Sequence, residues 1–131
     1  MSDDTEKWAY IAGFLDGEGC IEISHKGRYL RVSASQAYPE VLDWLVEEGW
    51  GRLFTDLVQY ESGYKRRFRW RIGAQAEVEA FLEGVTPYLI LKKSQAELAL
   101  KILREDRYAT LAEIELMKKL KRPPRRSRVL T

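Results

Sequence analysis

The chain has 131 residues, 22 of them Lys or Arg and 20 of them Asp or Glu, which gives a net charge of +2 at pH 7. This length and ordinary composition predict one globular domain. The single cysteine, Cys20, excludes an intramolecular disulfide and a zinc site made of several thiolates. No apolar run approaches the roughly 20 residues that cross a membrane, and the acidic start is wrong for a secretion signal. We therefore expect an intracellular protein with no membrane partner.

Apolar periodicity predicts two successive units of a helix and a β-hairpin, followed by further helices. The expected elements are a helix at 5–15, a hairpin at 20–26 and 28–36, a helix starting near Pro39, a hairpin at 52–59 and 65–72, and helices at 75–84, 93–105 and 109–120. The α-ββ-α-ββ-α order with extra C-terminal helices is typical of an α+β domain with an antiparallel sheet. We expect one domain over 1–120 and a basic, disordered tail over 121–131.

Basic residues are concentrated in two parts of the chain. The segment from Lys118 onward carries seven basic residues and no acid, which leaves 15 basic against 20 acidic residues in the rest. Within that acidic remainder, the strand-like ranges 20–35 and 52–73 hold nine basic residues and three acids. A basic sheet on an otherwise acidic protein predicts that one face of the sheet binds a polyanion.

The return strand of the second hairpin has the clearest alternation in the sequence. Period-two geometry places its apolar residues on one face and its basic residues on the other, the latter being Lys65, Arg67, Arg69 and Arg71. Four like charges in register repel one another and require an anion. The first hairpin is expected to add further polar and charged side chains to the same surface, namely Glu22, Ser24, Lys26, Arg28, Tyr29, Arg31 and Ser33.

The first helix contains two glycines four residues apart, Gly13 and Gly17, which share one helix face. Each glycine costs roughly 1 kcal/mol of helix propensity, so close packing against another backbone is expected to compensate. That backbone belongs either to the core of the same chain or to a second chain, and the pattern alone does not decide between them.

Two carboxylates, Asp16 and Glu18, stand among the glycines where this helix ends. The spacing is wrong for an EF-hand calcium loop, because the fifth position is Cys20. Acids at a helix C-terminus oppose the helix dipole. A bound cation would compensate for that opposition.

Residues 11–19, Ile-Ala-Gly-Phe-Leu-Asp-Gly-Glu-Gly, resemble the signature of the LAGLIDADG homing endonucleases, in the single-motif class that acts as homodimers. The resemblance extends over about residues 7–105. It includes the end of the second strand at 33–36, the turn at 49–51 and the lysine-containing segment at 87–96. It departs from the family pattern in having Glu18 where aspartate is commoner, and in having no arginine just after Gln36.

The resemblance implies a homodimer whose two motif helices pack side by side, with an interface that includes Ile11, Gly13, Asp16 and Gly17. It places Mg²⁺ at Glu18 and Gly17, and it makes Glu18, Gln36 and Lys92 the catalytic residues. Asp16 is also expected to hold the helix end and the turn. Ca²⁺ is expected to support binding with little cleavage, since its looser geometry suits a Mg²⁺ site poorly.

The sequence therefore favours a site-specific endonuclease that cuts both strands of a long, nearly palindromic double-stranded DNA target by Mg²⁺-dependent hydrolysis. Three alternatives remain open. An intron maturase would bind RNA and assist splicing. A DNA-binding regulator would keep the fold without the chemistry. A small dimeric structural module would explain the charge but not the motif.

Overall fold

The computed structural model describes residues 3–121, except for the side chains of Asp3 and His25. Its helices are α1 (Asp3–Glu18), α2 (Glu40–Glu47), α3 (Gln75–Val85), α4 (Lys93–Arg104) and α5 (Leu111–Lys121), with short 3₁₀ turns η1 (His25–Gly27) and η2 (Thr86–Tyr88). Its strands are β1 (Gly19–Ile23), β2 (Leu30–Gln36), β3 (Arg52–Tyr60) and β4 (Gly63–Ile72). The predicted α-ββ-α-ββ-α order is confirmed, and the expected tail over 122–131 lies outside the described residues. No helix within 3–121 is long and apolar enough to cross a membrane.

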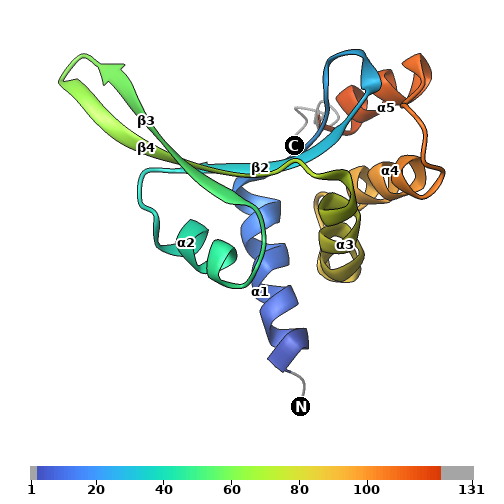
Figure 1. The fold of residues 1–131 in the computed structure, drawn as a ribbon, viewed down its shortest axis with the longest axis horizontal. Helices are drawn as coiled ribbons and strands as arrows, with labels where there is room; N and C mark the ends of the chain where they lie inside the picture. Colours follow the sequence, from blue (N-terminus) through green and yellow to red (C-terminus); the bar gives the residue numbers. More distant parts are fainter. Residues whose placement is uncertain (1–2, 122–131) are drawn as a thin grey trace, which may run out of the picture.

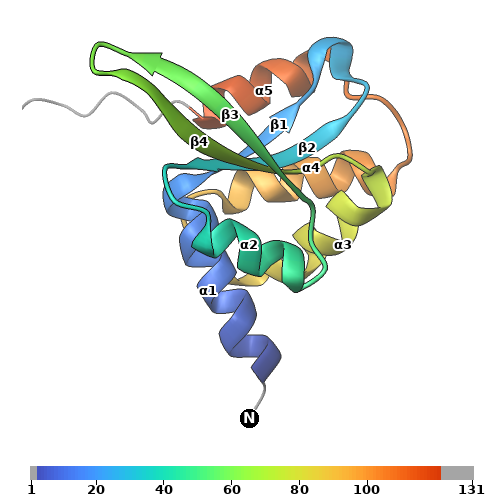
Figure 2. The same cartoon turned by 60° about the vertical axis from the view of Figure 1, so that its left-hand side comes forward.

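The four strands form one antiparallel sheet in the order β1-β2-β4-β3. Helices α1, α2 and α3 lie below this sheet in Figure 1, and the β3–β4 hairpin extends beyond them on the left. Figure 2 shows α5 beside β1 at the edge of the sheet. Since the helices cover only one face in the central part of the sheet, the alternating side chains of β4 meet two environments.

The covered face of the sheet forms the core with the helices. Trp70 and Ile72 of β4 and Phe81 of α3 are fully buried. The Trp70 indole donates a hydrogen bond of 2.8 Å to the carbonyl of Trp50, and both rings pack near Phe81. These contacts confirm the expectation that the apolar alternation of β4 faces the core.

The first hairpin differs from its expected form, because β1 ends at Ile23. Residues 24–29 form an irregular turn containing η1, in which Lys26 has a φ of 70° and Gly27 a φ of 72°. The Gly27 carbonyl accepts a 2.8 Å hydrogen bond from the amide of Ala109, so a distant loop holds this turn. The expected strand alternation through Ser24, Lys26, Arg28 and Tyr29 is therefore wrong, although the last three remain exposed in the turn.

A partly buried ionic cluster anchors α5. The Glu113 carboxylate accepts hydrogen bonds of 2.7 and 2.8 Å from the Arg107 guanidinium, and one of 2.9 Å from the Thr110 amide. Thr110 in turn accepts a hydrogen bond from the Glu113 amide, which completes a capping box. The Arg107 guanidinium and the Thr110 amide hold the pKa of Glu113 at about 2, well below its usual value of 4.5.

We expect Glu113→Gln to lower the free energy of unfolding by about 1–2 kcal/mol at pH 7, since solvent partly screens the pair. The folded-state pKa of Glu113 is depressed, so its contribution is present above pH 4.5 and is lost as the pH falls toward 2. Urea titrations between pH 2 and 7 measure this difference. Glu115→Gln is the matched control, because the Glu115–Lys118 pair on the same helix is exposed. An equal loss in both variants would contradict the assignment.

Candidate active site and nucleic-acid interface

The predicted catalytic residues Glu18 and Gln36 lie together where α1 joins the sheet. Gly19 pairs with Ala34 in the β1–β2 register, so the end of α1 lies beside the end of β2. The Gln36 side-chain amide donates a hydrogen bond of 2.7 Å to Glu18 Oε1. The last turn of α1 contains no basic residue of its own, and the dipole at this helix end disfavours the negative charge of the exposed Glu18 carboxylate. This corner of the molecule favours a cation.

Lys92, the third predicted catalytic residue, is held at the same helix end. Its ammonium group donates a hydrogen bond of 2.8 Å to the carbonyl of Asp16, one of the last-turn carbonyls that lack a partner within a helix. The Asp16 carboxylate accepts hydrogen bonds from the backbone amides of Ile90 and Lys92, at 2.8 and 2.9 Å. Asp16 thus fixes the segment leading into α4, and the structure brings Glu18, Gln36 and Lys92 to the C-terminal end of α1.

We expect Asp16→Asn to lower the melting temperature, because an amide has one acceptor oxygen where the carboxylate has two. Losing one hydrogen bond to a charged group costs about 1.5–3 kcal/mol. Thermal unfolding followed by circular dichroism measures the change. Glu18→Gln makes the same chemical change two residues away at an exposed carboxylate and serves as the control. A melting temperature that falls equally in both would contradict this role.

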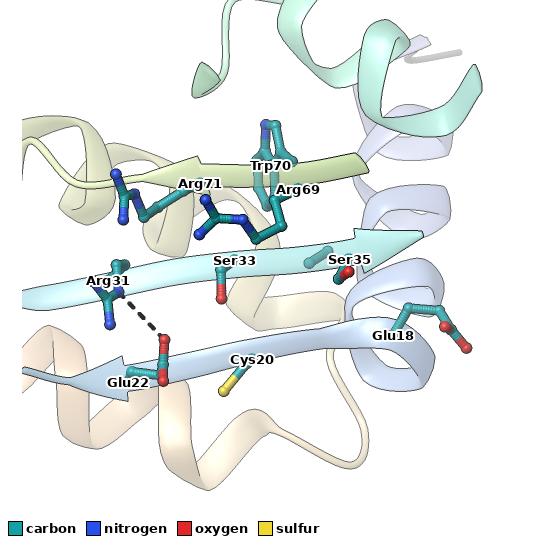
Figure 3. A pocket seen from close by; sticks show the side chains of 10 residues that line it. Glu18, Cys20, Glu22, Arg31, Ser33, Ser35, Arg69, Trp70 and Arg71 are labelled. Atoms are coloured by element: carbon teal, nitrogen blue, oxygen red, sulfur yellow. Dashed lines mark hydrogen bonds and ion pairs between the residues drawn. The ribbon is translucent and has the colours of Figure 1, made fainter. Parts of the chain in front are cut away.

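The uncovered face of the sheet forms a hollow next to Glu18, shown in Figure 3. Its volume is about 290 Å³, and its lining includes Glu18, Cys20, Glu22, Arg31, Ser33, Ser35, Arg69 and Arg71. Arg31, on β2, lies directly opposite Glu22 on β1 and donates a hydrogen bond of 3.3 Å to it through Nε. Predicted contacts from three strands therefore share one surface with the candidate catalytic carboxylate.

The basic residues of β4 extend this surface toward the tip of the second hairpin. Arg67, Arg69 and Arg71 alternate with the partly or fully buried Phe68, Trp70 and Ile72, whereas both Lys65 and Arg66 are exposed near the tip. Arg67 donates a hydrogen bond of 3.2 Å to the hydroxyl of Ser35, which ties β4 to β2. We use the name basic sheet face for the surface formed by Lys65, Arg67, Arg69 and Arg71 with Arg31, Ser33 and Ser35.

Two residues of β3 on this surface were not predicted from the sequence. Asp56 accepts a 2.6 Å hydrogen bond from Arg69 Nε. The Phe54 ring lies beneath two guanidinium groups, with its centroid 5.6 Å from Arg69 Cζ and 5.0 Å from Arg71 Cζ. Period-two alternation in the sequence could have located both residues. Positions 52, 54 and 56 of β3 lie opposite positions 71, 69 and 67 of β4, on the same face of the sheet.

The glycines of α1 lie on an exposed side of the helix. A Cβ atom added at Gly13 or Gly17 would meet no atom of the described chain within 4 Å. The alternative that these glycines allow packing within the chain's own core is therefore excluded for the described residues. Ile11 is 1% exposed and faces the core, which corrects its predicted place at a subunit contact. Tyr10, in contrast, is 53% exposed.

Among the described side chains, no group of three or more His, Cys, Asp or Glu residues is arranged to hold a metal ion. At the end of α1, a single copy thus offers a metal ion one exposed carboxylate, that of Glu18, next to Gly17. Any metal at this corner needs further ligands from water, from a bound phosphate or from another chain.

The basic sheet face, with the Glu18 carboxylate beside it, gives this α+β fold a positively charged surface next to a candidate metal ligand. No family model and no curated protein matches the chain. Among solved structures, the homing endonuclease I-CvuI bound to uncleaved DNA with magnesium is similar at a TM-score of 0.67 and 21% identity, covering 95% of this chain and 87% of I-CvuI. I-CvuI bound to its target with calcium gives a TM-score of 0.66, again at 21% identity and with the same coverage.

A double mutant of I-SmaMI is similar at a TM-score of 0.53 and 14% identity, covering 87% of this chain and 43% of I-SmaMI. This chain therefore spans less than half of that protein. The predicted fold is confirmed: the chain has the α+β fold of the LAGLIDADG homing endonucleases.

Proposed function

We propose that the protein is a homodimeric, site-specific homing endonuclease that cuts both strands of a long, nearly palindromic double-stranded DNA target. The observation that carries this proposal is the position of Glu18, hydrogen-bonded to Gln36 at the end of an exposed glycine-bearing helix and beside the basic sheet face. The similarity to I-CvuI, which was solved on DNA with magnesium or calcium, supports a DNA substrate and a divalent metal.

The residues at the end of α1 suit a Mg²⁺ ion, which prefers oxygen ligands and retains several waters. Glu18 would hold it through a carboxylate oxygen and Gly17 through a carbonyl of the last helical turn. When bound, the ion supplies Lewis-acid polarisation of a phosphate and a lowered pKa of bound water. Gln36 orients the Glu18 carboxylate by its 2.7 Å hydrogen bond. Lys92 offers a positive charge for the scissile phosphate.

A second copy of the chain supplies what one copy lacks. One chain carries one Glu18, whereas cutting two strands requires a carboxylate at each scissile phosphate. Close approach of two α1 helices along Gly13 and Gly17 would place both Glu18 carboxylates at a two-fold axis. Asp16 stays a proposed interface residue, although its carboxylate oxygens and its carbonyl also accept hydrogen bonds from the 90–92 segment.

The basic sheet face would supply affinity and sequence recognition. Arginine forks can bind guanine O6 and N7, while neighbouring phosphates neutralise the remaining positive charge. The exposed turn of the first hairpin, with Lys26, Arg28 and Tyr29, extends this surface at its other end. Ser24 is held inside that turn, where its hydroxyl accepts a 2.9 Å hydrogen bond from the Tyr29 amide. Among the residues proposed to contact DNA, Ser24 is therefore one whose hydroxyl is already engaged within the protein.

We expect the combined change of Arg67, Arg69 and Arg71 to Ala to weaken DNA binding and to reduce its salt dependence. Each lost base contact should cost roughly 1–3 kcal/mol, and each lost phosphate contact should reduce the salt slope by about 1. Fluorescence anisotropy at several salt concentrations measures both quantities. Combined alanine changes at Lys7, Lys101 and Arg104, which lie on α1 and α4, remove the same charge elsewhere and should have little effect. Unchanged affinity and salt slope in the sheet variant would exclude this face as the DNA site.

Incubating the protein with Mg²⁺ and a plasmid library of randomised inserts tests the proposed function directly. The expected result is linearised plasmid with inserts that share a nearly palindromic sequence. Binding to selected DNA without any cutting would instead identify a regulator. Selective binding to structured RNA, with stimulation of intron splicing, would identify a maturase.

A further inference from the structure

Two acids of the described strands, Glu22 and Asp56, lie beside the basic sheet face, and each is paired with an arginine of that face. Glu22 accepts a hydrogen bond from Arg31 Nε at 3.3 Å, and Asp56 accepts one from Arg69 Nε at 2.6 Å. In both pairs the carboxylate engages the Nε side of the guanidinium. The terminal nitrogens of Arg31 carry no described hydrogen bond, and those of Arg69 make one at 3.5 Å to the same carboxylate.

Stability does not account for these acids. The Glu22 and Arg31 side chains are 34% and 37% exposed, and those of Asp56 and Arg69 are 40% and 49% exposed. Exposed ion pairs of this kind contribute little to stability, typically about 0–1 kcal/mol. Each carboxylate also repels the phosphates that the rest of the surface attracts. Their presence on this face is better explained by a role in selecting bases.

We propose that Glu22 and Asp56 are positioning residues that make Arg31 and Arg69 specific for guanine, an inference that rests on the proposed function. A carboxylate at Nε fixes the plane of the guanidinium and leaves the two terminal nitrogens directed outward. Two parallel N–H groups match guanine O6 and N7. The carboxylate oxygens can also accept a hydrogen bond from the N4 amine of cytosine. Each carboxylate–arginine pair therefore recognises a G·C base pair.

The register of the sheet separates the two pairs along the DNA. Arg69 lies opposite Ser35, four residues beyond Arg31 along β2. At about 3.3 Å per residue, this separation is about 13 Å, which corresponds to about four base pairs for strands that follow the major groove. Each half-site should contain two G·C pairs at this spacing.

The test is selection of DNA from a randomised pool in Ca²⁺, followed by competition binding with single-base variants of the selected site. The wild type should require G·C at two positions of each half-site. A bidentate base contact gives a preference of roughly 5- to 150-fold. Glu22→Gln should reduce the preference at one of these positions by at least about fivefold, and Asp56→Asn should do so at the other. Melting temperatures should stay unchanged.

Glu83→Gln is the matched control, because Glu83 forms a similarly exposed ion pair with Arg104 far from the sheet face. It should alter no base preference. Electrostatic repulsion alone predicts a different result: both sheet variants would bind every sequence more tightly with unchanged base preferences, and that outcome would overturn the inference. A wild type that selects no DNA at all would overturn the proposed function together with the inference.

Discussion

Glu18→Gln should leave DNA binding intact and reduce cleavage by several orders of magnitude. Glutamine retains the size of the side chain and an oxygen that accepts the hydrogen bond from Gln36, so the local geometry is preserved. It removes the negative charge that would hold Mg²⁺ beside the phosphates, and with it the activation of water and the stabilisation of the leaving oxygen. In the proposed function the basic sheet face supplies the affinity, and this change leaves the residues of that face in place. Parallel measurement of binding and of plasmid linearisation separates the two effects.

Glu18→Asp is the matched control for charge. It shortens the side chain by one methylene group while keeping the carboxylate, and we expect it to retain measurable cleavage. Replacing Mg²⁺ with Ca²⁺ should reproduce the Glu18→Gln phenotype in the wild type, with binding and little cutting. If Glu18→Gln linearised its target at the wild-type rate, the mechanism would be falsified and the regulator and maturase alternatives would be restored.

Periodicity predicted the order and type of the elements because most of them place an apolar face against one shared core of the described residues. It failed where a tertiary contact overrides local preference. The helix was expected over 5–15, yet α1 continues to Glu18. Asp16 binds the amides of Ile90 and Lys92, more than 70 residues away, and this contact supports the last turn. Glycines predict a helix end from the local sequence alone. They contain no information about a hydrogen-bond partner that is distant in the chain.

The first hairpin shows the same limit. Lys26-Gly27 correctly marked a turn, but the strands end earlier than alternation suggested. The Ala109–Gly27 hydrogen bond and the Ser24–Tyr29 hydrogen bond stabilise an irregular turn in place of further strand pairing. The Ala109 contact could not be predicted from the sequence of the hairpin.

The candidate site could be predicted only as far as its residues belong to a motif or to a regular alternation. Glu18, Gln36 and Lys92 were identified through a resemblance, and the structure places them at one helix end. Phe54 and Asp56 were not predicted, because the surface was located from the charge alternation of β4 and not from the facing positions of β3. Ile11 was misassigned because the resemblance suggested the helix face but not which apolar residue turns toward the core.

Gly13→Leu should separate or misalign the subunits and abolish cleavage without unfolding the chain. A Cβ atom at this position meets nothing within 4 Å outside its own stretch of helix, so we expect the fold of one copy to accept a side chain there. Two helices that approach backbone to backbone should not accept it, because the added atoms occupy the space of the partner helix. Sedimentation at micromolar concentration should show a dimer for the wild type and a monomer or weakened dimer for the variant, with cutting of plasmid measured in parallel.

The sign of the stability change distinguishes an interface glycine from a structural one. Gly13→Ala should raise the stability of the dilute monomer by up to about 1 kcal/mol, because alanine favours the helix. The same change should weaken the dimer. Ala80→Leu, at an exposed position of α3, is the control for an added apolar side chain and should alter neither property. A wild-type chain that sediments as a monomer both free and on DNA would contradict the dimer. A loss of monomer stability in Gly13→Ala would place the role of this glycine within its own chain, because only a contact inside the monomer can oppose the gain in helix propensity.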